Sequence, residues 1–282
     1  MPDIALVTCR SLPEQDPDEE LLLNACANVG LSVELAAWDN PEIDWGRFRI
    51  AKLHSCWNYY EDPCGFGKWI DRASTETQIW NPPKMVRQNL DKRYLGKLEA
   101  HGVPVVPTRY LSCDSDLREA LDDTGWEQFV IKPTVSAASY MTKRFYRDEV
   151  CAAEAFAGEI LKSREAMVQP YMASVETGGE VSLIHIDGEL THCIAKEPRF
   201  SGHDESVSVA FQPSEALAAA AEVVMNTVKG PWLYSRVDLM LSVSGEWILS
   251  ELELIEPSLF LLQHPPAVER LVAALKFTLE RM

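Results

Sequence analysis

The segment "SRVDLMLSVSGEWILSELELIEP", residues 235–257, constrains the fold most, because its pattern predicts a β-hairpin. Two runs of alternating apolar and polar residues flank Ser244-Gly245, which predicts a two-residue loop with Val243 opposite Glu246. In that register Asp238 lies opposite Glu251, and Arg236 lies opposite Glu253, with all four side chains on one face. The other face is apolar and is expected to cover a core; it carries Val237, Leu239, Leu241, Ile248, Leu252 and Leu254.

Carboxylates that face each other on paired strands cost about 0.2–1 kcal/mol per pair. Arg236 offsets part of this repulsion between Asp238 and Glu251. A hard cation removes it, since Mg²⁺ takes carboxylate oxygens together with phosphate oxygens. The alternative is a solvated polar face on an amphipathic hairpin, and the hairpin alone leaves both interpretations open.

Composition restricts the class of protein. The chain has 282 residues and is 46% hydrophobic, which predicts a globular protein of two domains. Seven scattered cysteines without a C-x-x-C pair indicate free thiols in a reducing compartment, and the N-terminus lacks the features of a signal peptide, so we expect the cytoplasm. A net charge of −17 argues against a nucleic-acid backbone as partner but allows a nucleotide in a local basic pocket.

The order of predicted elements indicates two parts. Strands and helices alternate over residues 1–84, which predicts a small parallel α/β unit, and "NPPK" is the expected linker. Beyond it we expect a helix over "MVRQNLDKRYLGKLEAHG", then strands and helices that include a hairpin turning at Asp187-Gly188. No apolar run reaches the length of a membrane span, so we expect no membrane association.

Common nucleotide and hydrolase motifs are absent from the sequence. It has no G-x-x-x-x-G-K-[ST] loop, no G-x-G-x-x-G after the first strand and no G-x-S-x-G. Instead it carries an ordered series: Lys92 after Asp91 in the expected helix, Lys132 in "VIKP", the strand "VQPYM", then Glu180, then the hairpin. Taken singly, each of these residues is as well explained by a surface charge or an edge-strand position. Together they supply what ATP with Mg²⁺ requires.

The motifs "DKRYL", "VIKP", "VQPYM", "GEVSL", "RVDL" and "ELE", in this order, resemble the ATP-grasp superfamily. The resemblance is strongest to the glutathione-synthetase-like ligases, and among them to the O-ureido-serine cyclo-ligase type. It implies an α/β (α+β) fold in which a pre-ATP-grasp α/β domain, residues 1–85, precedes an ATP-grasp domain, residues 86–282. Within the second domain it implies a lid subdomain at about 103–172 and a metal-bearing lobe at about 173–282.

The resemblance also implies a role for each matching residue. The implied roles are two lysines on the ATP phosphates (Lys92, Lys132), an adenine hinge (Gln169, Tyr171, Met172), a carboxylate on the ribose (Glu180), magnesium ligands (Asp238, Glu251, Glu253) and a basic residue near the transferred phosphate (Arg236). The family often has Asn at the last metal position, so Glu253 is a departure that leaves the number of metal ions open.

Three segments differ from the pattern of the family. The expected phosphate-covering loop, "TVSAASYMTKRF", has no glycine, and His54 and Asn58 stand where Arg and Asp are usual. The segment "EPRFSGHDESVSVAF" diverges from a basic, glycine-rich substrate loop. We therefore expect substrate selection in the first domain and around Lys196 and Arg199, with Arg199 as the foremost contact to substrate or phosphate.

These observations predict an ATP-dependent carboxylate–amine ligase that forms an amide through an acyl phosphate and releases ADP and phosphate. The amide forms between two molecules or by cyclisation, and the substrates are small and amino-acid-like. The alternatives are a non-catalytic, regulatory nucleotide-binding protein on the same fold and, less favoured, a two-domain dehydrogenase. We expect small-molecule carboxylate and amine partners, and a homo-oligomer is compatible with the sequence.

Overall fold

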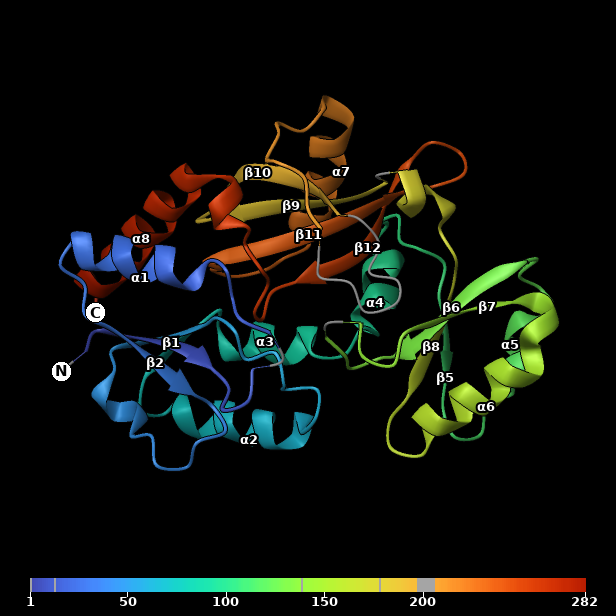
Figure 1. Cartoon of the computed structure of the whole chain (residues 1–282), viewed down its shortest axis with the longest axis horizontal. Helices are drawn as coiled ribbons and strands as arrows, with labels where there is room; N and C mark the ends of the chain where they lie inside the picture. Colours follow the sequence, from blue (N-terminus) through green and yellow to red (C-terminus); the bar gives the residue numbers. More distant parts are fainter. Residues whose placement is uncertain (1, 13, 138, 178, 197–205) are drawn as a thin grey trace.

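The computed structural model describes residues 2–12, 14–137, 139–177, 179–196 and 206–282, which form three four-stranded sheets (Figure 1). The predicted mixed α/β class is confirmed, with one parallel and two antiparallel sheets. Each sheet buries an apolar face under helices, as separate layers require. The domain limits at residues 85/86, 103, 172 and 173 stay predictions.

The first sheet is parallel and has the strand order β2-β1-β3-β4. Its strands are β1 (Ile4–Thr8), β2 (Val33–Ala37), β3 (Ile50–Leu53) and β4 (Gln78–Trp80). Its helices are α1 (Glu19–Asn28), η1 (Trp45–Arg47) and α2 (Pro63–Ala73). One face packs under α1 and the C-terminal helix α8 (Pro265–Glu280), and the other packs on α2, as Figure 1 shows. Both faces are therefore buried, which explains the continuous apolar run of β1.

The segment after the first sheet forms two short helices, so the prediction of one continuous helix was wrong. Helix α3 spans Pro83–Asn89 and α4 spans Tyr94–Ala100. The break lies at Asp91, whose carboxylate accepts a hydrogen bond from the backbone N–H of Arg93 at 2.9 Å. Asn89, at the end of α3, contacts a strand distant in sequence, because its side-chain amide forms hydrogen bonds with the backbone of Leu252 and Leu254. Lys92 therefore lies in a turn and not in a helix.

The second sheet is antiparallel, has the strand order β5-β8-β6-β7 and is the right-hand lobe of Figure 1. Its strands are β5 (Arg109–Leu111), β6 (Gln128–Pro133), β7 (Lys143–Tyr146) and β8 (Ala166–Pro170). Its helices are α5 (Leu117–Asp122), η2 (Arg147–Glu149) and α6 (Val150–Leu161), and α5 and α6 enclose one apolar core with the sheet. Strand β5 and helix α5 were not predicted.

The third sheet has the order β10-β9-β11-β12 and contains the hairpin predicted within residues 235–257. Its strands are β9 (Glu180–Ile186), β10 (Glu189–Lys196), β11 (Tyr234–Leu241) and β12 (Trp247–Glu253). The remaining helices are η3 (Ala173–Thr177), α7 (Glu215–Met225) and η4 (Leu261–Gln263). Helix α7 covers the apolar face together with part of α4, so the opposite, polar face of β11 and β12 is left to line a cavity.

The hairpin has the predicted pairing at its charged end and a different loop. Asp238 pairs with Glu251 and Arg236 pairs with Glu253. The N–H of Ser242 donates to the carbonyl of Glu246 at 2.8 Å, so the loop has three residues, 243–245, and not two. A bulge between Asp238 and Leu239 then shifts the register back by one residue. The two deviations cancel, which is why the predicted partners at the charged end are correct.

The bulge also changes which residues of β12 face the core. Leu249 pairs with Leu239 and belongs to the core beneath α7. Ile248 pairs with Met240, which lines the cavity, so Ile248 lies on the face opposite to the predicted one.

Candidate active site

One cavity of about 270 Å³ gathers most of the residues predicted for the site. Its walls are the polar face of the third sheet, the end of β6 with the loop that follows it, and loops of the first sheet. The predicted residues that line it are Lys92, Lys132, Glu180, Lys196, Arg236, Asp238, Glu251 and Glu253. Four basic and four acidic side chains from distant parts of the chain therefore meet in one place.

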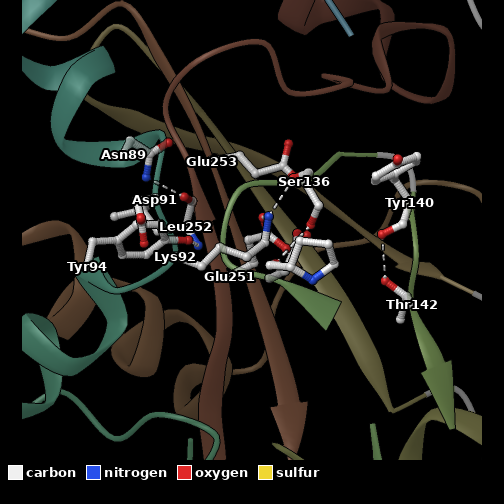
Figure 2. Close-up of polar contacts among 12 residues, drawn as sticks. Asn89, Asp91, Lys92, Tyr94, Ser136, Tyr140, Thr142, Glu251, Leu252 and Glu253 are labelled. Carbon is white, nitrogen blue, oxygen red and sulfur yellow. Dashed lines mark hydrogen bonds and ion pairs between the residues drawn. The ribbon is translucent and has the colours of Figure 1, made fainter. Parts of the chain in front are cut away.

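Lys92 connects the α3–α4 turn to the hairpin and to the loop after β6 (Figure 2). Its ammonium lies 2.8 Å from a Glu251 carboxylate oxygen and donates to the carbonyl of Ser136 at 2.6 Å. Its own N–H donates to the carbonyl of Thr134 at 2.8 Å. The lysine is buried, so it is neither the solvated helix residue nor a flexible surface charge.

Lys132 reaches the same cavity from the end of β6, where it pairs with Met167 of β8. Burial lowers the pKa of Lys132, and the nearby Glu251 carboxylate acts in the opposite direction. Alternation along β6 places Phe129 and Ile131 in the core of the second sheet and Lys132 on the cavity side.

Asp238 lies at the centre of a buried ion-pair network. Its oxygens accept hydrogen bonds from Lys196 at 2.8 Å, from Arg236 at 2.9 and 3.0 Å, and from the Ser182 hydroxyl at 2.5 Å. Burial alone would raise the pKa of Asp238, but Arg236 and Lys196 hold it well below its usual range. Arg236 also pairs with Glu253 across the hairpin. The repulsion expected between facing carboxylates is thus offset by more cations than the hairpin itself supplies.

Glu251 and Glu253 lie side by side on one face of β12, yet their pKa values are shifted in opposite directions. Burial raises the pKa of Glu251, but Lys92 and Lys132 outweigh it, so that this pKa is lowered. Burial raises the pKa of Glu253 to about 7, because the neighbouring Glu251 and Asp238 charges counteract Arg236. Glu251 is therefore kept ionised, whereas Glu253 takes up a proton near neutral pH.

The oxygen donors of the cavity fit a magnesium ion in part. Within the described ranges, no three His, Cys, Asp or Glu side chains converge as a ready-made metal site. The side chains of Glu251 and Glu253 are 25% and 24% exposed, so both are open to the cavity. Mg²⁺ typically keeps several waters and binds one or two carboxylates together with phosphate oxygens, which these two glutamates suit. Asp238 would first have to release Lys196 or Arg236.

Glu180 and Lys196 begin and end the β9–β10 pair, where they are direct cross-strand partners. The Lys196 ammonium lies 3.7 Å from Glu180 and 2.8 Å from Asp238. Burial lowers the pKa of Lys196, but the two carboxylates reverse this effect and the pKa is raised, which keeps the residue a cation. Arg199 lies outside the described residues.

Of the three predicted hinge residues, Gln169 lies in β8, and Tyr171 and Met172 follow it directly; none of them belongs to the described lining of the cavity. The Gln169 amide donates to the Thr108 hydroxyl at 2.9 Å. The Tyr171 hydroxyl donates to Glu176 at 2.8 Å, and burial followed by this contact raises its pKa to about 12. Met172 lies half-buried in the next turn. Their adenine-binding role stays a prediction.

The glycine-free loop after β6 covers the cavity with backbone. Ser136 and Ala137 line the cavity, and the Ser136 carbonyl receives Lys92. Further along, the ring of Tyr140 lies against Tyr60 of the first domain, with 4.6 Å between centroids. Arg164 holds both, because it lies over the Tyr140 ring and donates to the carbonyl of Tyr60 at 2.9 Å.

The cavity residues that sequence reasoning missed include Trp57, Tyr59 and Glu256. It expected substrate contacts at His54 and Asn58 instead. The structure places His54 3.1 Å from Asp16 in a buried cluster, and it ties Asn58 to Trp38 at 2.7 Å. The loop that carries His54 and Asn58 therefore reaches the cavity through Trp57 and Tyr59, and its role in substrate selection stays a prediction.

Comparisons with known proteins agree with this arrangement. A family model described as the N-terminal domain of D-cycloserine synthetase DcsG matches residues 4–81. The cycloserine biosynthesis protein DcsG of Streptomyces lavendulae is 34% identical over 275 residues, which cover 91% of this chain and 92% of the relative. The crystal structure of D-cycloserine synthetase DcsG has a TM-score of 0.88 at 32% identity and covers 98% of this chain and 99% of its own.

A more distant structure shares the fold. D-alanine–D-alanine ligase from Bacillus anthracis, crystallised with ATP, has a TM-score of 0.72 at 16% identity, with 99% of this chain and 97% of that chain covered. Of the helices in the described part of the chain, none is long and apolar enough to cross a membrane.

Proposed function

The chain belongs to the family of the cycloserine biosynthesis protein DcsG within the ATP-grasp ligases, and from this premise we propose that it closes a small amino acid into a cyclic amide. It is an ATP-dependent ligase that forms a carbon–nitrogen bond, and ATP-grasp ligases use ATP with Mg²⁺. The proposal extends this to cyclisation, in line with the relatives' names, and to a substrate of the O-ureidoserine type, which the resemblance to the O-ureido-serine cyclo-ligase type implies. A cavity of about 270 Å³ suits a small acceptor.

The observation that carries the proposal is the convergence of cations and carboxylates in one cavity. Lys92 and Lys132 come from two different segments, while Glu251 and Glu253 come from one strand. In the proposal the lysines bind ATP phosphates, and Glu180 binds the ribose. Asp238, Glu251 and Glu253 hold Mg²⁺, which neutralises phosphate charge when bound. Gln169, Tyr171 and Met172 contact adenine.

In the proposed reaction, a carboxylate oxygen of the substrate attacks the γ-phosphorus, and the bond to ADP breaks. The product of this step is an acyl phosphate. A nitrogen of the same molecule then attacks its carbonyl carbon, loses a proton and expels phosphate. Arg236 and Lys196 neutralise charge on the transferred group, with Arg199 as a further candidate contact, and the loop over Ser136 excludes water.

The test is ADP release on mixing with ATP, Mg²⁺ and the D form of O-ureidoserine, with product mass as the second readout. Cyclisation predicts a product of substrate mass minus one water, whereas intermolecular ligation predicts the sum of two acceptors minus one water. D-serine and D-alanine serve as acceptor controls that lack the ureido nitrogen. ATP binding without ADP release for any acceptor would favour the alternative, a regulatory nucleotide-binding protein, and refute the proposal.

A further inference from the structure

Glu256 is a carboxylate that the proposed chemistry does not use, although it lines the same cavity. It lies three residues beyond Glu253, at the point where the chain leaves β12. The indole N–H of Trp57 donates to its carbonyl oxygen at 3.1 Å, which attaches it to the first domain. Glu256 is 7% exposed, so its carboxylate is nearly removed from bulk water.

Among the described residues, none serves as the direct counter-charge of the Glu256 carboxylate. No other described residue donates a hydrogen bond to it or forms an ion pair with it. The nearest basic groups are committed elsewhere, since Lys92 bonds Glu251 and Ser136, and Arg236 bonds Asp238 and Glu253. A buried, unpaired carboxylate is strongly unfavourable unless a cation joins it. Burial and the nearby Glu253 raise its pKa to about 8, in keeping with this lack of a partner.

Two aromatic residues stand beside Glu256 in the cavity wall. Trp57 and Tyr59 both line the cavity and both come from the loop after β3. Glu256 lies near enough to Tyr59 to act on its pKa, which burial first and then this charge raise well above the usual value. Aromatic faces attract ammonium groups and reject anions, and a carboxylate supplies the charge-assisted hydrogen bond. The combination suits a cationic amine and does not suit phosphate.

We propose that Glu256, with Trp57 and Tyr59, binds the free ammonium group of the amino-acid substrate and thereby selects acceptors with an unblocked amine. The inference rests on the proposed function for the identity of the acceptor. It assigns the basic wall around Lys132 and Arg236 to phosphate and carboxylate, and the wall around Glu256 to the ammonium.

The experiment separates recognition from turnover. Calorimetry measures binding of O-ureidoserine, D-serine and D-alanine, each beside its N-acetyl derivative, to the wild type, Glu256→Gln, Glu256→Asp and Glu246→Gln. Glu246 is an exposed residue of the same hairpin and serves as the matched control. Loss of one charge-assisted hydrogen bond corresponds to about a 10- to 100-fold change in Kd.

We expect the wild type and Glu246→Gln to bind free-amine forms at least 10-fold better than N-acetyl forms. In Glu256→Gln this preference should vanish, while the Kd for ATP stays within about two-fold, and Glu256→Asp should recover part of it. Retained preference in Glu256→Gln, or no wild-type binding of any free-amine probe, overturns the inference. Loss of Mg²⁺-dependent stabilisation in Glu256→Gln would also overturn it, because Glu256 would then be a metal ligand. ADP release judges the proposed function separately.

Discussion

Replacement of Glu251 by Gln tests the role of the paired carboxylates, because it keeps the shape of the side chain and removes one charge. Glu251 is the counter-ion of the buried Lys92, at 2.8 Å. Gln can still accept a hydrogen bond from Lys92. The free energy of unfolding therefore falls only by the difference between a charged and a neutral acceptor, about 1 kcal/mol. In a protein of this size that lowers Tm by about 2–4 °C.

The effect of magnesium and nucleotide is larger. At a ligand concentration of 100 Kd, binding stabilises the fold by about 2.7 kcal/mol, and a 100-fold weaker affinity leaves about 0.4 kcal/mol at the same concentration. The rise in Tm with Mg²⁺ plus ATP, relative to ATP with EDTA, should therefore almost disappear in Glu251→Gln. Turnover should fall about 100- to 1000-fold, as for the loss of one preorganised electrostatic contact.

Differential scanning fluorimetry and ADP release measure both effects, with Glu246→Gln at the exposed tip of the same hairpin as control. The control should match the wild type in turnover and in metal response. If Glu251→Gln also keeps wild-type turnover and a full Mg²⁺-dependent rise, the carboxylates form a polar face and not a metal site.

Three further outcomes are expected. Lys132→Ala should lower kcat/KM about 10- to 100-fold in steady-state assays, whereas exposed Lys97→Ala should leave it unchanged. If Lys132→Ala has the kcat/KM of the wild type, Lys132 lines the cavity without binding phosphate. Tyr140→Ala should raise ADP release that yields no product by about 2- to 10-fold, because the stacked contact with Tyr60 is lost and water enters, while Tyr140→Phe should not. Because the pKa of Glu256 is raised to about 8 in the fold, the folded state binds the proton more tightly, and its stability falls as pH rises from about 4.5 to about 8. Glu256→Gln should therefore gain Tm over the wild type at pH 8 and lose that gain near pH 4 in metal-free scans; a gain independent of pH would contradict the sign.

The local patterns of the sequence predicted the hairpin partners because alternation of side chains is a property of each strand. Asp238 and Glu251 could be paired from the sequence, but the three-residue loop and the bulge that compensates for it could not, since both arise from packing. Continuous helix periodicity hid the break before Lys92, because Asn89 bonds a strand more than 160 residues away. No sequence pattern indicated a role for Glu256, since it follows the strand in a loop, where side-chain periodicity does not apply.

The charged side chains of the cavity pair with one another, and this pairing couples the binding of the two proposed ligands. Two of the cations proposed to bind phosphate are held by carboxylates proposed to bind the metal: Lys92 by Glu251, and Arg236 by Asp238 and Glu253. Phosphate that takes a cation away leaves a carboxylate without its partner, and a metal ion that takes the carboxylate leaves the cation free for phosphate. Each ligand thus lowers the cost of binding the other, so we expect ATP and Mg²⁺ to bind here cooperatively. Glu256 does not take part in this exchange, because no described residue forms an ion pair with its carboxylate. In our proposal the ammonium group of the substrate supplies its counter-charge.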